Sequence, residues 1–185
     1  MALKKRVTNF VSNWLGVLIA VAIVAVSAAF GGMYLYARSR LDNTLNLVTQ
    51  IVTLPYNEGF VQTGTVENPP GNTYHIKIQV YNLYNDTVEV AVSDISIKID
   101  SFTFPMSQNG QWSKSVPTGY AAFEGDITID KETLLDLIDR GPVDLVISGN
   151  ISASGQYSWV KRQTSREFTI NIPDVRFELA SETQP

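Results

Sequence analysis

The chain has no cysteine and a single histidine, His75, among its 185 residues. Without cysteine there is no thiolate to bind zinc or to act as a nucleophile. A Ser-His-Asp triad would depend wholly on His75, which lies in an alternating apolar and polar run typical of a strand surface. No glycine-rich phosphate-binding loop is present either, because Gly31-Gly32 falls inside an apolar run. The sequence therefore predicts a protein that is not an enzyme and that uses no cofactor, no metal and no small-molecule substrate.

Basic residues are scarce beyond Arg40. Five of the 14 Lys and Arg residues lie at or before that position, whereas all 18 Asp and Glu residues lie after it. Residues 41–185 therefore carry nine basic and 18 acidic side chains, a net charge of −9. Phosphate binding needs a basic stripe, so we expect no nucleic-acid partner.

Charge is absent altogether from one apolar run of 24 residues, Trp14 to Ala37. A helix of this length, at 1.5 Å per residue, can cross a hydrocarbon core of ~30 Å. The run predicts a transmembrane helix over residues 12–37, preceded by a cytoplasmic segment over residues 1–11. Small side chains recur along one side and favour close helix-to-helix packing in the membrane; they are Gly16, Ala20, Ser27 and Gly31.

A cleaved secretory signal is the alternative for this run, because Lys4-Lys5-Arg6 precedes it and Val26-Ser27-Ala28 has residues that signal peptidase accepts. The run continues past Ala28, however, to tyrosines followed by arginines, which is the pattern of a retained anchor. Three basic residues before the run and two directly after it favour a cytoplasmic N-terminus and an extracytoplasmic domain. Two glycosylation acceptor patterns, at Asn85 and Asn150, are compatible with that side.

An apolar stripe at helical spacing follows the run, formed by Leu41, Leu45, Val48 and Val52. It predicts a helical stalk or linker over residues 38–57, with the helix continuing to about Leu54 before Pro55. The stripe must be buried against something. Two partners are open: the chain's own domain, or another chain in an oligomer.

The rest of the chain has the alternation of an antiparallel β protein. Residues 73–83 place Tyr74, Ile76, Ile78 and Val80 on one face. Residues 86–100 give two alternating pieces whose parity changes at Ser93-Asp94, which predicts a bulge. Further strands are expected near residues 101–105, 111–116, 121–130, 143–155 and 166–175, with turns at 108–110 and 117–119. Tyr157 and Trp159 are expected to be core or sheet-edge aromatics, and residues 175–180 can cover a sheet edge.

One segment, residues 130–142, breaks the β pattern. Asp130 is a good N-cap and Gly141-Pro142 ends the segment, so we predict a helix of about two turns. Its apolar face is formed by Leu134, Leu135 and Ile138. The acidic residues in and before it do not have the glycine-containing spacing of a calcium loop, and we interpret them as a cap and a solvated face; they are Asp126, Asp130, Glu132, Asp136 and Asp139.

The order of these elements resembles the late embryogenesis abundant group 2 domain, also called the WHy domain, over about residues 58–175. The resemblance is carried by Asn82-Leu83-Tyr84-Asn85, Gly119-Tyr120, the Leu-rich helix at 134–138 and the strand from Val143 to Gly149. It implies a seven-stranded immunoglobulin- or fibronectin-like antiparallel β-sandwich with one short inserted helix, often placed behind a membrane anchor. The family's Asn-Pro-Asn turn is altered here, with Leu83-Tyr84 in place of the proline. No catalytic residue set comes with the resemblance.

Together these features predict a single-pass membrane protein with an extracytoplasmic WHy-like β-sandwich over residues 58–180 and a tail over 181–185. The first functional hypothesis is an accessory subunit of a membrane or envelope complex, with a membrane-protein partner or a second copy. The second, implied by the resemblance, is stress protection, as in desiccation, at a cell surface. A pilin-like filament protein is the third, although the N-terminus lacks the small-residue processing site that pilins need before the hydrophobic helix.

Overall fold

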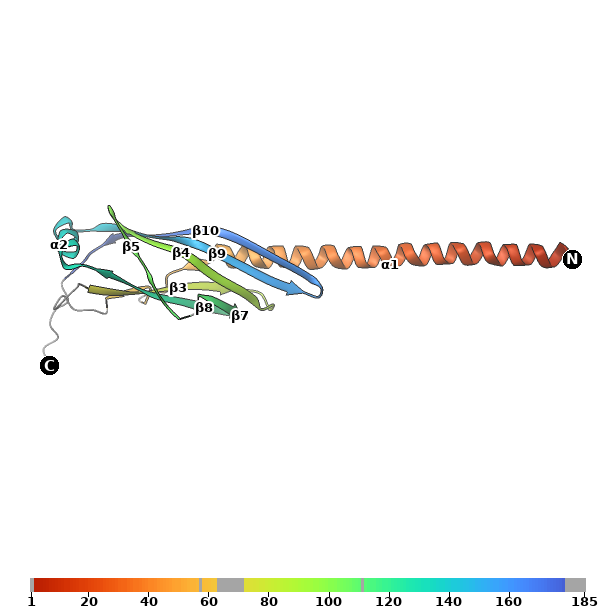
Figure 1. Ribbon diagram of the computed structural model, residues 1–185, viewed down its shortest axis with the longest axis horizontal. Coiled ribbons are helices and arrows are strands. Elements are labelled where there is room, and N and C mark those ends of the chain that lie inside the picture. The colour runs from red at the N-terminus through yellow and green to blue at the C-terminus, as the bar shows by residue number, and fades with distance from the viewer. Residues whose placement is uncertain (1, 57, 63–71, 111, 179–185) are drawn as a thin grey trace.

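The computed structural model describes residues 2–56, 58–62, 72–110 and 112–178, and the side chains within them except those of residues 2–13 and 109. The predicted tail over residues 181–185 lies outside these ranges. One long helix, α1 (Ala2–Gln50), runs from the N-terminal end into a β-sandwich (Figure 1). Its last turns are part of the sandwich, because they pack against strands of both sheets.

Helix α1 ends at Gln50, four residues before the predicted end at Leu54. Three β-branched residues, Ile51-Val52-Thr53, follow at once, and such side chains favour strands over helices. Val52 and Thr53 form the short strand β1 (Val52–Thr53), which pairs with β3. The chain therefore leaves the helix by joining a sheet, before Pro55 is reached.

The sandwich consists of two antiparallel five-stranded sheets, which confirms the predicted fold class. The first has the order β1-β3-β8-β6, with β2 also paired to β3. The second has the order β10-β9-β4-β5, with β7 also paired to β4. The remaining bounds are β2 (Phe60–Gln62), β3 (Asn72–Asn82), β4 (Val88–Ile99), β5 (Phe102–Pro105), β6 (Ser107–Asn109), β7 (Ser113–Val116), β8 (Gly119–Ile129), β9 (Val143–Tyr157) and β10 (Val160–Val175).

Within the described residues the strands number ten, whereas the resemblance implied seven. The difference is made by β1, β2 and β6, which have only two or three residues each. All three pair at the margins of the first sheet, against β3 or β8. Pairs this short leave little periodicity in the sequence.

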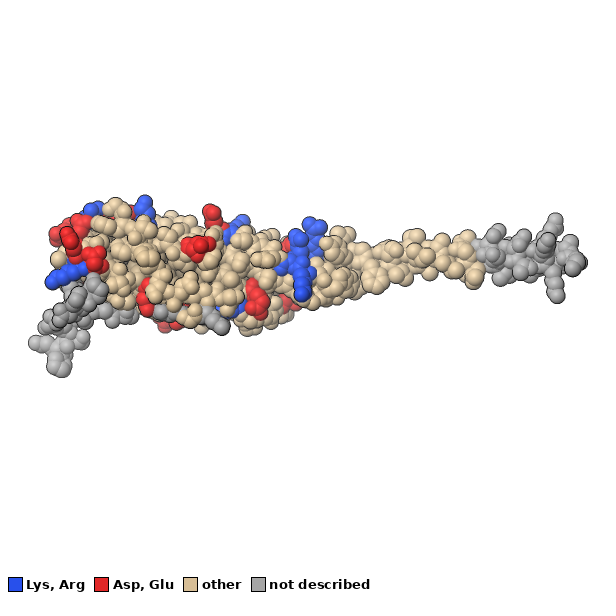
Figure 2. Space-filling model, in the orientation of Figure 1, with Lys and Arg blue, Asp and Glu red and all other residues tan. Residues whose placement is uncertain are grey.

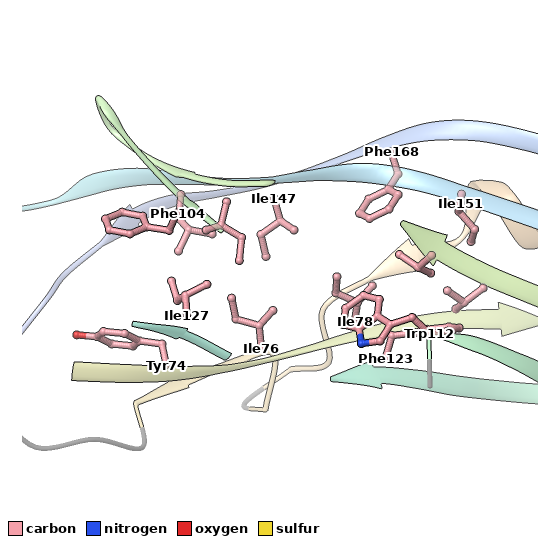
Figure 3. Close-up of a cluster of buried hydrophobic side chains, with 14 of the residues drawn as sticks. Tyr74, Ile76, Ile78, Phe104, Trp112, Phe123, Ile127, Ile147, Ile151 and Phe168 are labelled. Carbon is pink, nitrogen blue, oxygen red and sulfur yellow. The ribbon is translucent and has the colours of Figure 1, made fainter. Parts of the chain in front are cut away.

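Alternation identified the two strands that matter most for the core. In β3 the predicted apolar face is buried, and in β4 the pairing register with β9 shifts between Ser93 and Ser96. Asp94 has a φ of 53°, so the predicted bulge is present and returns Ile97 to the interior. Figure 3 shows the resulting core, in which Ile76 of one sheet faces Ile147 of the other and Phe123 lies opposite Phe168.

The predicted helix is α2 (Lys131–Arg140), at the end of the sandwich away from α1 (Figure 1). The Asp130 side chain accepts a hydrogen bond from the Thr133 N–H, which confirms the N-cap. The predicted apolar face was wrong in one member. Leu134 and Leu137 are the buried residues, while Leu135 is 40% exposed, because the short helix meets the sandwich with only a narrow stripe.

Candidate functional site

The β9–β10 hairpin extends along α1 beyond the rest of its sheet (Figure 1). Strand β4 supports β9 only as far as the Glu89–Ser154 pair, yet β9 and β10 stay paired to Tyr157 and Val160 at the tip. Near the tip of the hairpin, the neighbour of the two strands is therefore α1 and not a third strand. An isolated two-stranded ribbon is only marginally stable, so this contact with α1 supports the hairpin.

The contact is apolar and close. Leu41 of α1 lies over Gly155 of β9, where a Cβ would be 3.2 Å from Leu41 Cδ2 and 3.6 Å from Leu45 Cδ2. Ala37, Leu41 and Val160 form a small buried cluster beside the main core. The absence of a side chain at Gly155 thus leaves room for the Leu41 side chain against β9.

The apolar stripe predicted on the stalk is buried in the chain's own domain. Leu41, Leu45 and Val48 are each no more than 1% exposed, and Val52 is half-buried in β1. Residues 38–50 are therefore not a free stalk. They close the sandwich between β9, β10 and β3, because the stripe continues the interior of the two sheets.

Two aromatic residues of the hairpin contact α1 rather than the core. The Tyr157 ring meets Tyr36 edge-on with centroids 6.1 Å apart, and the Trp159 ring lies 6.0 Å from Phe30. Trp159 is 52% exposed at the hairpin tip. The expectation of a core or sheet-edge position for this pair was wrong for Trp159, because the two-residue turn carries it past the end of the sheet.

Ion pairs join α1 to two different parts of the sandwich. Arg40 Nε donates to Asp86 Oδ2 at 2.7 Å, and Arg162 Nε donates to Asp42 Oδ1 at 2.8 Å. The Arg40 guanidinium also lies 4.7 Å from the centre of the Tyr157 ring. The hydrogen bond to Asp86 raises the pKa of Arg40, and that to Asp42 raises the pKa of Arg162, so both stay charged.

Asn82 holds the turn that positions Asp86. Its side-chain Nδ2 donates to the carbonyl oxygens of Asp86 (2.7 Å) and Val116 (3.0 Å), and its Oδ1 accepts from the Tyr84 N–H. Asn82 is fully buried, and every polar atom of its side chain is paired. In the sequence it stood out only as the first residue of the turn that resembles Asn-Pro-Asn.

Acidic and basic side chains are spread along the whole length of the sandwich (Figure 2). Basic residues gather where α1 leaves the sandwich, and we call Arg38, Arg40, Lys161 and Arg162 the proximal basic cluster. At the opposite end, around α2, acidic and basic side chains lie together. Two members of the proximal basic cluster, Arg38 and Arg40, precede residue 41, so the net charge of −9 for residues 41–185 does not include them.

Beyond the sandwich, α1 is long and apolar enough to span a membrane by its length and composition. Side chains from Leu15 to Tyr36 are exposed, and no atom lies within 4 Å of a Cβ built at Gly16 or Gly31. A shallow groove of about 360 Å³ runs along this stretch beside Ala20, Ala25 and Ala28. The proposed helix-packing residues, Gly16, Ala20, Ser27 and Gly31, all lie in this uncovered part.

The two sequons differ in their surroundings. Asn85 is exposed in the turn before β4. Asn150 lies in the middle of β9, paired with strands on both sides, and its Nδ2 donates to Asp94 Oδ2 at 3.0 Å. Glycosylation at either residue stays a prediction.

Other polar features of the described sandwich include a histidine–aspartate contact and an open depression. His75 Nδ1 lies 2.8 Å from Asp126 Oδ1 across the β3–β8 pair, at a half-exposed position. Among the described residues no group of three or more His, Cys, Asp or Glu is placed to hold a metal ion. An open polar depression of about 650 Å³ lies beside the proximal basic cluster, between Glu89, Gln156 and Lys161.

Comparison with solved structures finds β-sandwiches. One is a putative late embryogenesis abundant (LEA) protein (15% identity, covering 81% of this chain and 87% of that chain, TM-score 0.28). A second is the PapD-like domain 7 of human CEP192 (15% identity, 69% and 87%, TM-score 0.34). A third is AggA, the major subunit of aggregative adherence fimbriae type I of Escherichia coli (9% identity, 68% and 97%, TM-score 0.34).

No protein-family model matches the chain, and no curated protein does. Likenesses of this size extend to the sandwich architecture alone and assign neither a family nor a function.

Proposed function

We propose that this chain is a non-enzymatic, single-pass membrane protein whose β-sandwich serves as an accessory subunit of a membrane or envelope complex. The observation that carries the proposal is the continuity of α1, whose last turns lie in the core of the sandwich while its apolar part is uncovered. A partner that grips the helix inside the bilayer would then also fix the orientation of the sandwich outside it. A flexible linker between anchor and domain could not transmit position in this way.

The partner in this proposal is another membrane helix. Side chains on the uncovered part of α1 have lipid or protein as their only possible neighbours, and small residues allow two helix backbones to approach closely. We place the N-terminus in the cytoplasm and the sandwich outside it, on the excess of Lys4, Lys5 and Arg6 over the two arginines that directly follow the helix. Protease treatment of intact cells tests this orientation, and a sandwich that stays protected would reverse it.

The test of the function is the composition of the native protein after gentle detergent extraction. We expect a fixed set of other membrane polypeptides to co-purify, and to be lost when Gly16, Ala20 and Gly31 are replaced by leucine. A matched control replaces Ala22, Ala25 and Ala29 by leucine, which adds the same bulk at other positions around the helix. Loss of the partners in both variants, or in neither, would remove the small-residue face from the proposal.

Two alternatives are separated by the same preparation. The resemblance to the late embryogenesis abundant group 2 domain supports a stress-protective surface protein, which would be a lone monomer whose amount rises on drying or heating. A pilin-like protein would appear as a homopolymer in sheared surface material. Either result would replace the accessory-subunit proposal.

A further inference from the structure

The tip of the β9–β10 hairpin lies beside Phe30, within the apolar run of α1. Trp159 occupies a two-residue turn with Ser158, whose φ of 56° marks the tight reversal. Half of its surface is exposed, and its ring packs on Phe30. What surrounds the exposed part of Trp159 therefore depends on where Phe30 lies along the apolar run of α1.

The length of the apolar run and the rise of the helix place Phe30 relative to the surface of a bilayer. Phe30 precedes Arg38, the first charge after the apolar run, by eight residues, or about 12 Å along the helix axis. The uncharged run has 24 residues, whereas a hydrocarbon core of ~30 Å needs only about 20. Even with all the surplus placed at the sandwich end, Phe30 lies within the apolar slab. The Trp159 ring, which packs on Phe30, therefore lies at the sandwich-side boundary of the apolar slab or inside it.

Aromatic residues from two distant segments share this boundary. Tyr36 lies on α1, and Tyr157 and Trp159 come from the hairpin. Tyrosine and tryptophan are the residues enriched at membrane–water interfaces, because an apolar ring and a polar atom suit the headgroup level. Here the tertiary structure assembles such a belt, with the hairpin tip next to the helix.

The charges just above the belt favour anionic headgroups. The acidic members of this region, Asp42 and Asp86, pair with Arg162 and Arg40. This leaves Arg38, whose Nε is 3.6 Å from the shared Asp42, and Lys161, which is exposed and lines the depression that Glu89 also lines. With Glu89 counted beside Asp42 and Asp86, the four cations of the proximal basic cluster exceed the three nearby carboxylates by one, although residues 41–185 as a whole are acidic.

We propose that the hairpin tip is a second membrane contact, in which Trp159 inserts into the interface of the bilayer that α1 spans and the proximal basic cluster binds anionic lipid headgroups. This inference rests on the proposed membrane anchoring. It adds that the sandwich is held at a fixed depth and tilt by lipid at two points, the helix and the hairpin, rather than by the helix alone.

The test uses tryptophan fluorescence of the full chain in vesicles. The chain has three tryptophans, so Trp14→Phe with Trp112→Phe leaves Trp159 alone. We expect Trp159 to emit at shorter wavelength than tryptophan in water and to be quenched by lipids brominated on their acyl chains. The shift should be larger in vesicles containing phosphatidylglycerol than in pure phosphatidylcholine, and Arg38→Gln with Lys161→Gln should abolish that difference. Lys131→Gln, at the far end on α2, is the matched control.

Two further single-tryptophan variants distinguish failure of the hairpin contact from failure of the membrane anchor. Trp14 alone reports the apolar part of α1, and Trp112 alone reports the sandwich core, which brominated lipid should not reach. Quenching of Trp14 without Trp159 would leave the anchor standing and overturn the hairpin contact. Failure of both would overturn the anchor as well.

A Trp159 that is shielded but not quenched by lipid would assign the tip to a protein interface and also overturn the proposal. If Trp112→Phe prevents folding, an environment-sensitive dye on Ser158→Cys gives the same readout, because the natural chain has no cysteine.

Discussion

Arg162 on β10 and Asp42 on α1 lie 120 residues apart in the chain, yet Arg162 Nε donates to Asp42 Oδ1 at 2.8 Å. The pair fastens the outer strand of one sheet to the helix that leaves the sandwich. Both side chains remain more than one-third exposed, so solvent screens the attraction between them. The ion pair therefore forms where α1 is already held against the sandwich, and it contributes little to holding the helix there.

We accordingly expect Asp42→Asn to lower the free energy of unfolding by less than about 1 kcal/mol, the ordinary range for an exposed ion pair. The loss should shrink at high salt. Urea unfolding of the full chain in a mild detergent, at low and high salt, measures both effects. A loss of several kcal/mol would mean that the ion pair, and not apolar packing, holds the helix in place.

The apolar contact should matter more. Leu45→Ala removes a fully buried side chain at the junction and should cost about 2–5 kcal/mol. Gly155→Val should also destabilise, because the new Cβ would lie 3.2 Å from Leu41 Cδ2 and the branches would press further into the helix. Leu135→Ala, on the exposed side of α2, is the control and should change stability by no more than about 0.5 kcal/mol. Thermal unfolding followed by circular dichroism compares the three.

Asn82→Ala should cost about 1–3 kcal/mol, because the buried Val116 carbonyl and the part-buried Asp86 carbonyl both lose this donor. The same change loosens the turn that carries Asp86, so hydrogen exchange should rise at the turn and at Arg40. Asn85→Ala, at an exposed position of the same turn, should leave hydrogen exchange unchanged. Equal effects of the two substitutions would contradict the assigned role of Asn82.

Asp130 gives a pH-dependent prediction. Hydrogen bonds from the backbone N–H and side chain of Thr133 lower the pKa of its carboxyl group below the ordinary value of 3.8. A lowered pKa means that the ionised cap stabilises the fold above the unfolded-state value and that this contribution is lost as the pH falls through the folded-state value. Asp130→Ala should cost about 1 kcal/mol at neutral pH, and the cost should shrink in acid. The measurement is the free energy of unfolding of the unchanged protein and of Asp130→Ala from neutral to acid pH. A difference between them that does not change with pH would contradict the prediction.

The sequons should behave differently in a host that attaches N-linked glycans. Asn85 is exposed in a turn, and we expect its modification to shift the mobility of the protein on a gel, with the shift lost in Asn85→Gln. Asn150 is held by Asp94 within β9, so a glycan there would displace a paired side chain. A shift that persists in Asn85→Gln and disappears only in Asn150→Gln would reverse this order.

Features within one strand or helix could be predicted from the sequence because their cause is local. Alternation in β3, the change of parity at Ser93-Asp94 and the cap at Asp130 each depend on the backbone of a few neighbouring residues. The error at Leu135 has the opposite cause. Which side of α2 is buried depends on where the sandwich lies, and an amphipathic helix with four apolar residues offers more than one choice.

The sequence by itself determined an uncharged helix long enough to cross a membrane, followed by an antiparallel β domain with one inserted helix. Only the tertiary structure decided that the stripe from Leu41 to Val48 is buried in that domain and that Gly155 makes room for it. It also decided that Trp159 meets Phe30 and that four basic residues gather at the same end. The physical reason is that Leu41 meets Gly155, and Phe30 meets Trp159, across more than 100 positions of the chain. Periodicity shows which side of a helix is apolar, but what covers that side depends on how the sheets pack.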